Sequence, residues 1–294
     1  MRFASLLALL LVLTAATAAP ARDIYVDNLN GDDRRHGETP VSQGAAGGPC
    51  RSIAKALRVA KPGDRIIVAN TGQPYRECVS IQGGRHSGSG DYPFEIIGNG
   101  ATLDGRISLA ENEWEFVAAD TFRTRPPRMS YQQLFLGDVV AARRFEEGGR
   151  FPALEPLEWI LLDGWIYFRV EPGKLPQSYD LSCCGHQVAL TLYDVHDVIV
   201  RDLVVRGYQL DGVNCHDNVR RSDLINLTCI ENGRSGISIG GASRVRIDTC
   251  TAAGNGAAQL RVEGYCIVQT IENTFDGTSA PAIVREGGTI IEEK

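Results

Sequence analysis

A loose repeat of 22 to 24 residues runs from Asp202 toward the C-terminus and limits the possible folds more than any other feature. Its four units begin at Asp202, Asn226, Asp248 and Glu272. Each unit contains a short β-branched segment, a turn rich in Gly and Asn, and a second short segment. A fixed period of this length indicates a solenoid. Because the units are too short to hold a helix, we predict that each is one coil of a parallel β-helix.

The N-terminus has the composition of a secretory signal peptide. Arg2 is followed by an apolar run, Leu6 to Leu13, and then by small residues up to Ala21. This order is typical of a signal peptide, and the apolar run is too short to span a membrane. We therefore expect residues 1–21 to be removed. The mature protein is then expected to be secreted, periplasmic or at the cell surface, without a membrane span.

The charge of the chain limits its partners. The formal net charge is −6, which argues against broad binding to nucleic acids or anionic membranes. A local cluster of arginines could still bind an acidic sugar. Lysine is scarce and occurs only at Lys55, Lys61, Lys174 and Lys294.

The sequence has eight cysteines. An even number in an exported protein allows disulfides. Zinc is disfavoured because there is no Cys-x-x-Cys pair and no histidine at ligand spacing. Cys229 and Cys250 occupy nearly the same place in successive coils, so we expect them to stack inward as small apolar side chains. One or two disulfides remain open.

Residues 22–105 are expected to form an N-terminal cap and the first coils. Apolar residues at Ile53, Ala56, Leu57 and Ala60 have helical spacing, and Pro62 follows them. A short amphipathic helix here would cover the open end of the solenoid core.

Residues 106–182 break the period and contain Trp114, Trp159 and Trp165. We interpret this stretch as a β-rich insertion with its own aromatic core, although some aromatics could instead stack on sugar rings. Residues 183–294 return to the coil pattern. The sequence ends in the strand-like segment 290–293, which predicts an uncovered last coil and hence a further cap or a partner.

Several segments resemble secreted bacterial right-handed parallel β-helix proteins of the pectate-lyase-like superfamily. They are Ile24–Asp27, Asn30–Asp33, Pro49–Ala60, Lys61–Asp64, Pro74–Glu77, Ile97–Gly100 and the later coil segment Asn232–Ile239. The resemblance implies an all-β, right-handed, single-stranded parallel β-helix that acts on a polysaccharide. These motifs indicate architecture better than chemistry, because Gly and Asn serve the turns.

The densest polar cluster, 208–218, contains the candidate catalytic residues Asp211, His216 and Asp217, and Arg234 joins them from the next coil. A histidine beside carboxylates could transfer a proton at neutral pH. The cluster weakly resembles the Asp-Pro-His-Asp motif of β-helix mannuronan epimerases, but residues 212–215 separate Asp211 from His216. The alternative is a pair of solvated turns.

Arginines at related coil positions could neutralise a uronate carboxylate in one groove. Arg206, Arg261, Tyr208 and Glu263 are therefore the candidate substrate-binding residues, although each arginine could equally be a solvated side chain. The resembling pectate lyases use a coil lysine as base, and this chain has no lysine between residues 174 and 294. His216 or an arginine would have to serve instead.

Two other kinds of site are less well supported. The segment Gly236–Gly240 resembles polygalacturonases, but this chain lacks their histidine and their paired aspartates; a carboxylate pair of Asp211 with Glu231 or Glu263 remains open. The segment Asp27–Asp33 could bind calcium, yet it lacks the regular ligand spacing and is interpreted as a polar turn. No cofactor is expected, with calcium left open.

These observations favour action on an extended, acidic polysaccharide, as a lyase or C5-epimerase. The alternative is a non-catalytic carbohydrate-binding or cell-surface β-helix. An enzyme should bring Asp211, His216 and an arginine together in an open groove, whereas a binding module would scatter them. We expect a polysaccharide partner and no nucleic acid; the oligomeric state is left open.

Overall fold

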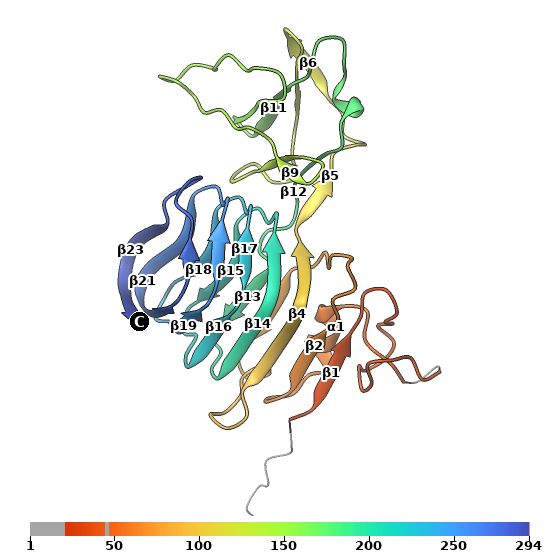
Figure 1. Cartoon of the computed structure of the whole chain (residues 1–294), viewed down its shortest axis with the longest axis vertical. Helices are drawn as coiled ribbons and strands as arrows, with labels where there is room; N and C mark the ends of the chain where they lie inside the picture. Colours follow the sequence, from red (N-terminus) through yellow and green to blue (C-terminus); the bar gives the residue numbers. More distant parts are fainter. Residues whose placement is uncertain (1–20, 45–46, 294) are drawn as a thin grey trace, which may run out of the picture.

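The chain folds as a parallel β-helix with an N-terminal helix and a β-rich insertion, as predicted (Figure 1). The computed structural model describes residues 21–44 and 47–293. All but the last residue of the expected signal peptide lies outside the described residues. No helix in the described part of the chain is long and apolar enough to cross a membrane.

The main sheet curls into three faces, which we call sheets A, B and C. Sheet A contains β3 (Val79–Gln82), β13 (Leu190–Tyr193), β15 (Asp211–His216), β18 (Ser235–Ile239) and the first parts of β21 (Ala258–Ile271) and β23 (Ile283–Glu293). Sheet B contains β1 (Asp23–Val26), β2 (Arg65–Val68), the first parts of β4 (Phe94–Asp104) and β14 (Val198–Arg206), then β16 (Ser222–Ile225), β19 (Arg244–Asp248) and the last parts of β21 and β23. Sheet C contains the last parts of β4 and β14 with β17 (Thr228–Ile230), β20 (Thr251–Ala253) and β22 (Thr274–Phe275).

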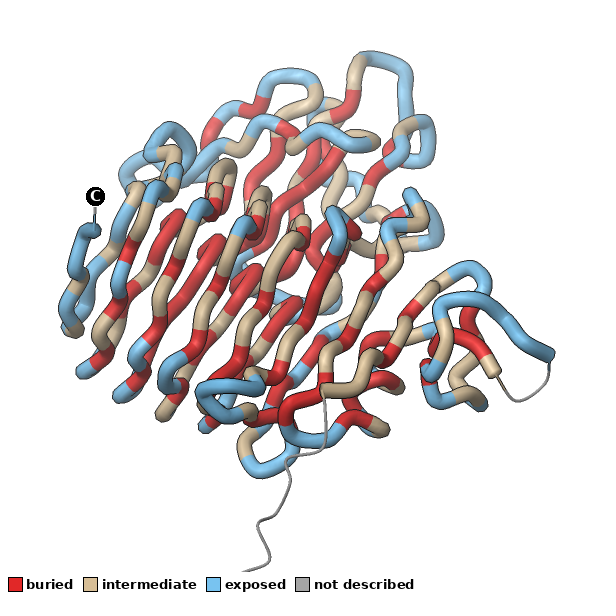
Figure 2. The backbone as a smooth tube through the Cα atoms, turned by 60° about the horizontal axis from the view of Figure 1, so that its bottom comes forward, coloured by how far each residue is buried: buried red, intermediate tan, exposed pale blue. Residues whose placement is uncertain are grey.

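Equivalent residues of successive coils pair in register. In sheet A, Leu190 pairs with Val213, Val213 with Ile237, and Ile237 with Leu260. All four are buried, so one inward position builds a continuous aliphatic stack. Figure 2 shows buried strand positions running through the coils, with exposed turns at their edges.

The turn from sheet B to sheet C contains one non-glycine residue with positive φ in each coil, followed in the first coil by Gly100, which also has positive φ. The non-glycine residues are Asn99, Asp202, Asn226, Thr249 and Glu272. Asn and Asp adopt this left-handed conformation more readily than other non-glycine residues. The sequence repeat therefore marks this turn, although the third unit begins at Thr249 and not at the predicted Asp248.

Helix α1 (Ile53–Val59) lies against one end of the coils. The Ser52 side chain accepts the Lys55 backbone N–H at its start, and Ile53 and Leu57 are buried in the coil core. The Glu77 carboxylate accepts the backbone N–H groups of Ile53 and Ala54 at 3.0 and 2.9 Å. Burial raises the pKa of Glu77 despite these bonds.

All eight cysteines are free thiols, and seven of them are buried. Cys229 and Cys250 both point into the coil core, as expected. They are not stacked on one another in register, because Cys229 pairs with Ala252.

The insertion leaves the coils after β4 and forms two four-stranded antiparallel sheets. One contains β6 (Glu115–Ala118), β7 (Thr121–Thr124), β10 (Trp159–Leu162) and β11 (Trp165–Arg169); the other contains β5 (Arg106–Ser108), β8 (Leu134–Leu136), β9 (Val139–Val140) and β12 (Leu181–Cys184). A second core around the buried Trp159 and Phe168 is separate from that of the coils. Figure 1 shows the insertion standing on one edge of the coil stack.

Candidate functional site

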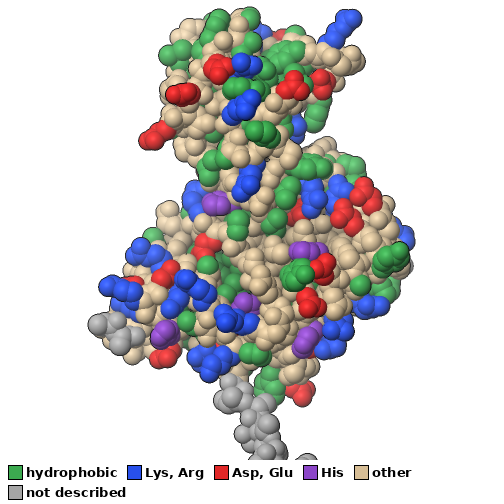
Figure 3. Space-filling view, turned by 180° about the vertical axis from the view of Figure 1, so that it is seen from behind, with side chains coloured by type: hydrophobic (Ala, Val, Ile, Leu, Met, Phe, Trp, Pro, Cys, Tyr) green, Lys and Arg blue, Asp and Glu red, His purple; other side chains and the backbone are tan. Residues whose placement is uncertain are grey.

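The outer face of sheet A carries three of the residues selected from the sequence, His216, Arg261 and Glu263. Alternate residues of each strand point outward, and their positions continue across the strands in rows. One row runs through Gln82, Tyr193 and His216. A parallel row runs through Asn214, Ser238 and Arg261. Seen from behind, the coil body presents histidine, acidic and basic side chains on one face below the insertion (Figure 3).

Asp211 and Arg234 form an ion pair at the start of these strands. Arg234 Nε and Nη2 donate to the Asp211 carboxylate at 3.0 and 2.5 Å, and Asn214 donates to Oδ2 at 2.9 Å. Asp211 is fully buried. The carboxylate raises the pKa of Arg234. Because its oxygens are already hydrogen-bonded and shielded from solvent, Asp211 is not available as a base in this arrangement.

His216 lies at the other end of the strand that Asp211 begins. The two residues are five positions apart on an extended strand, which places their Cα atoms roughly 16 Å apart. The predicted convergence of Asp211, His216 and Arg234 in one groove is therefore not found. The four residues 212–215, which distinguish this chain from the epimerase motif, account for the separation.

His216 instead belongs to a cluster with Tyr193 and Asp217. The rings of Tyr193 and His216 pack edge to face with centroids 5.0 Å apart. His216 Nδ1 lies 3.8 Å from Asp217 Oδ1, and the two side chains are 39% and 53% exposed. The Asp217 carboxylate raises the pKa of Tyr193. We call these three residues the proton-transfer cluster, because histidine, tyrosine and carboxylate can all exchange protons.

Gly240 leaves the surface beside this cluster without a side chain. Gly240 follows β18, next to His216 in its row, and its N–H donates to the Cys215 carbonyl at 2.8 Å. A side-chain carbon at Gly240 would meet nothing nearer than Glu263, at 3.9 Å. The surface between His216 and Glu263 therefore has room for a ligand group.

Two exposed arginines lie on the other side of the cluster. Arg58 and Arg85 line a cavity of about 410 Å³ over β3, together with Ser80 and Gln82. Gln82 pairs with Tyr193, so the cavity is one strand away from the proton-transfer cluster. Neither arginine forms an ion pair with any residue within 21–44 and 47–293.

Arg261 and Glu263 are on sheet A but bind each other. Arg261 Nη1 lies 3.4 Å from Glu263 Oε1 and 3.1 Å from Glu286 Oε2. The Arg261 side chain is only 12% exposed. A substrate carboxylate would have to displace these partners.

Tyr208 and Arg206 lie elsewhere. Tyr208 is fully buried, and its hydroxyl donates to the Glu77 carbonyl at 2.6 Å, so it has a structural position. Arg206 is on sheet C, where Nη2 donates to Glu231 Oε2 at 2.7 Å. Neither side chain faces sheet A, and we do not retain them among the substrate-binding candidates.

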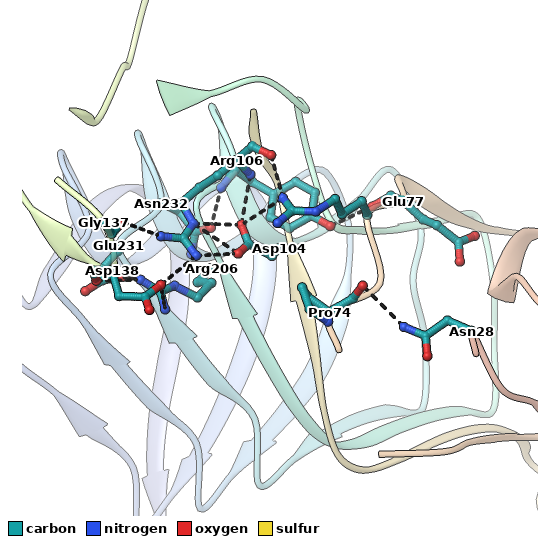
Figure 4. Close-up of polar contacts among 12 residues, drawn as sticks. Asn28, Pro74, Glu77, Asp104, Arg106, Gly137, Asp138, Arg206, Glu231 and Asn232 are labelled. Carbon is teal, nitrogen blue, oxygen red and sulfur yellow. Dashed lines mark hydrogen bonds and ion pairs between the residues drawn. The ribbon is translucent and has the colours of Figure 1, made fainter. Parts of the chain in front are cut away.

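Arg206 belongs to a network that attaches the insertion to sheet C (Figure 4). Arg106 forms a bidentate pair with Asp104, with Nη2 to Oδ2 at 2.7 Å, and also contacts Asp138 at 3.1 Å. Burial alone would raise the pKa of Asp104, but the Arg106 guanidinium outweighs it and holds that pKa low. A polar cavity of about 580 Å³ lies next to this network, with Arg76 and His186 in its wall.

The turn considered for calcium uses its carboxylates within the protein. Asp27 Oδ1 accepts the backbone N–H groups of Leu29 and Asn30, both at 2.8 Å. Asp33 accepts the Ser52 hydroxyl at 2.7 Å. Among the residues that the structure describes, no group of three His, Cys, Asp or Glu side chains is arranged to hold a metal ion.

Sequence reasoning missed Tyr193, Arg58 and Arg85. Tyr193 is 23 residues before His216, one coil period, so extending the repeat backward would have found it. Arg58 and Arg85 lie outside the repeats, and nothing in their local sequence distinguishes them from solvated arginines.

No protein-family model matches the sequence, and no curated protein is similar enough to count as a match. Several solved structures align with most of the chain. A glycoside hydrolase aligns with a TM-score of 0.55 and 11% identity, over 86% of this chain and 74% of that one. The complex of XylC with xylose aligns at 0.46 and 12% identity, over 92% and 70% of the two chains. Pectate lyase Pel9A aligns at 0.32 and 10% identity, over 94% and 79%. At these identities the likeness concerns the fold alone.

Proposed function

We propose that this protein binds an extended, acidic polysaccharide across β3, β13 and β15 and acts on it by proton transfer, as a lyase or C5-epimerase. The observation that carries the proposal is the proton-transfer cluster on an open sheet face, one strand from Arg58 and Arg85, which have no carboxylate partner among the residues that the structure describes. The fold shared with a glycoside hydrolase supports a carbohydrate ligand.

Each group has a defined role. Arg58 and Arg85 would bind uronate carboxylates, because guanidinium groups pair well with carboxylates. Binding at a cation makes the neighbouring C5–H bond more acidic. His216 would take the C5 proton, because histidine is the side chain most often used as a general base. Tyr193 could donate a proton, either to the leaving oxygen at C4 or back to C5 on the opposite face of the ring.

The experiment measures both outcomes of C5 deprotonation. The full chain is incubated with a panel of uronate polymers. Ultraviolet absorbance detects the unsaturated product of elimination, and NMR in D₂O detects deuterium at C5 after epimerisation. We expect activity that falls by about a hundredfold or more in His216→Ala, since general base catalysis typically contributes that much. We expect weaker substrate binding in Arg85→Gln.

The matched control is His36→Ala, which removes an exposed histidine of the N-terminal loop. It should leave activity unchanged. Full activity in His216→Ala, or neither product nor deuterium with any polymer, would exclude proton transfer at this site.

A non-catalytic carbohydrate-binding module is the second candidate. It is favoured by one observation: the arginines expected from sequence to bind uronate, Arg206, Arg234 and Arg261, all have carboxylate partners within the protein. Retention on polysaccharide columns without any chemical change would support this function.

A further inference from the structure

A groove on the outer face of sheet B is lined by four arginines. It lies where β16, β19 and the last part of β21 run side by side, and it has a volume of about 420 Å³. We call it the arginine groove after Arg220, Arg221, Arg244 and Arg246. Nothing in the proton-transfer chemistry uses it.

Two of the four arginines are bound within the protein. Arg221 Nη2 donates to Asp197 Oδ2 at 2.6 Å, and this bond holds the pKa of Asp197 at about 2. Arg246 pairs with Asp223, with Nη2 to Oδ2 at 3.0 Å. These pairs fix the walls of the groove.

The other two arginines have free guanidinium groups. Arg220 and Arg244 are exposed, and neither forms an ion pair with a residue in the described part of the chain. Arg244 donates only to the backbone carbonyl of Ala242, at 3.3 Å. Arg220 lies two residues before β16, and Arg244 is the first residue of the neighbouring strand β19, so the two free charges line the same groove.

We propose that the arginine groove binds the anionic groups of an acidic polysaccharide, at a second site distinct from the proton-transfer cluster. Guanidinium groups bind carboxylate or sulfate through paired hydrogen bonds. The half-buried Ile267 supplies apolar surface in the same groove, against which the C–H face of a sugar ring can pack.

The position of the groove suits a long chain. The segment from Asp217 to Arg221 leads from the end of β15 directly to β16, so the groove begins one turn beyond His216. A polysaccharide that crosses the cluster could continue around this turn into the groove. The groove would also bind such a chain when no chemistry occurs at His216, so this inference goes beyond the proposed function.

A glycan fits the groove better than a nucleic acid does. Binding to a phosphate backbone needs an extended basic surface. This protein has a net charge of −6, and the groove itself contains the Asp223 carboxylate. Carboxylates beside guanidiniums suit a ligand that carries both hydroxyl donors and anionic groups.

The test compares affinities of the full chain for four probes: polygalacturonate, dextran sulfate, neutral dextran and single-stranded DNA. The variant is Arg220→Gln/Arg244→Gln, made in the parent protein and again in His216→Ala. We expect it to bind the preferred anionic glycan about tenfold more weakly and with a shallower salt dependence. In the His216→Ala background, Arg220→Gln/Arg244→Gln should weaken glycan binding by the same factor as in the parent protein. Preference for polygalacturonate would identify the anion as carboxylate, and preference for dextran sulfate would identify it as sulfate.

The control is Arg128→Gln/Arg150→Gln, which removes the same charge from two exposed arginines of the insertion. Unchanged affinity in Arg220→Gln/Arg244→Gln, or an equal loss in the control, would overturn the proposal. Tighter binding to DNA than to either anionic glycan would overturn the assignment to a polysaccharide. Circular dichroism of each variant establishes that its fold is retained. If His216→Ala showed that no proton transfer occurs, the proposal that the arginine groove binds glycan would still stand on these affinities.

Discussion

The coils and the insertion are both all-β, yet they are stabilised in different ways. In the coils, each inward position repeats after one turn, so Val213 and Ile237 extend the same aliphatic row. In the insertion, antiparallel strands enclose a single core around Trp159 and Phe168, whose residues have no periodic equivalents. A periodic core can be extended from one unit to the next, whereas the insertion core depends on a few large side chains.

The polar contacts differ in the same way. Several coil ion pairs join residues one turn apart: Asp197–Arg221, Asp211–Arg234 and Asp223–Arg246 are 24, 23 and 23 residues apart. Within the insertion, Glu115–Arg123 and Glu171–Lys174 are only 8 and 3 residues apart. These coil pairs therefore connect neighbouring coils, whereas the two insertion pairs connect residues close in sequence.

The largest effect should come from Trp159→Ala. Trp159 is fully buried, and its Nε1–H donates to the Ala141 carbonyl at 3.1 Å. We expect the insertion to lose about 4 kcal/mol of unfolding free energy, while the separate coil core stays folded. Urea unfolding followed by circular dichroism, with limited proteolysis, would show early cleavage confined to 106–182.

The half-buried Trp165, which packs against Arg123 at 4.2 Å, provides the control. Trp165→Ala should lower the unfolding free energy of the insertion by less than Trp159→Ala does. If Trp159→Ala instead lowered one transition of the whole chain, the two regions would not be independent.

The next effect concerns the buried ion pair of the coils. Arg234→Met leaves the fully buried Asp211 carboxylate without its guanidinium. We expect a loss of about 3 kcal/mol, partly restored in Asp211→Asn/Arg234→Met, where no charge is buried. Thermal and urea unfolding measure both.

In the insertion, Arg123→Met breaks the more exposed pair with Glu115. It should lower the unfolding free energy by less than Arg234→Met does, because solvent screens an exposed ion pair. If Arg123→Met and Arg234→Met lowered the unfolding free energy equally, ion pairs of the coils and of the insertion would not differ in strength.

A smaller effect is expected at Asn255, which bonds to the coil before it. Its Oδ1 accepts from the Asn232 backbone at 2.9 Å, and its Nδ2 donates to the Cys229 carbonyl at 2.9 Å. Asn255→Ala leaves these buried groups unpaired, at a cost of about 2 kcal/mol. Asn112→Ala, at a half-buried amide of the insertion, should cost less when both are measured by urea unfolding.

The smallest effect is a pH dependence at the junction of α1 and the coils. His86 is buried; its Nδ1 accepts the Gln82 N–H, and its Nε2 lies 3.0 Å from the Leu57 carbonyl, as in a neutral imidazole. Burial lowers the pKa of His86. In the unfolded chain His86 has the ordinary histidine pKa of 6.5, so below that pH the unfolded state binds more protons than the folded state. The contribution of His86 to the unfolding free energy is therefore fully present above pH 6.5 and decreases as the pH falls below it.

Unfolding free energies measured between pH 7 and pH 5 should show this decrease. His36→Gln should keep it, because His36 is exposed. His86→Gln should abolish it; an unchanged slope in that variant would assign the pH dependence to other groups.

Much of the fold could be predicted because its signals are local and repeated. Gly, Asn and Asp mark the turns, and the helical spacing at Ile53 and Leu57 marks α1. The candidate site was predicted only in part. His216 and Asp217 do lie together, but Asp211 lies at the far end of the same strand, because an extended chain separates residues that a short motif would keep close.

By itself, the sequence determined the period of the coils, the cap helix and the presence of a β-rich insertion, since each depends on neighbours along the chain. Only the tertiary structure decided which polar groups meet. Tyr193 contacts His216 across one coil, and Arg85, from the turn after β3, lines the same cavity as Arg58 of α1. The tertiary structure also decided which arginines have carboxylate partners among the described residues. For pairs such as Asp211–Arg234, the partner lies one coil away. Whether the two meet depends on strand register and side-chain direction, which a local sequence pattern does not predict.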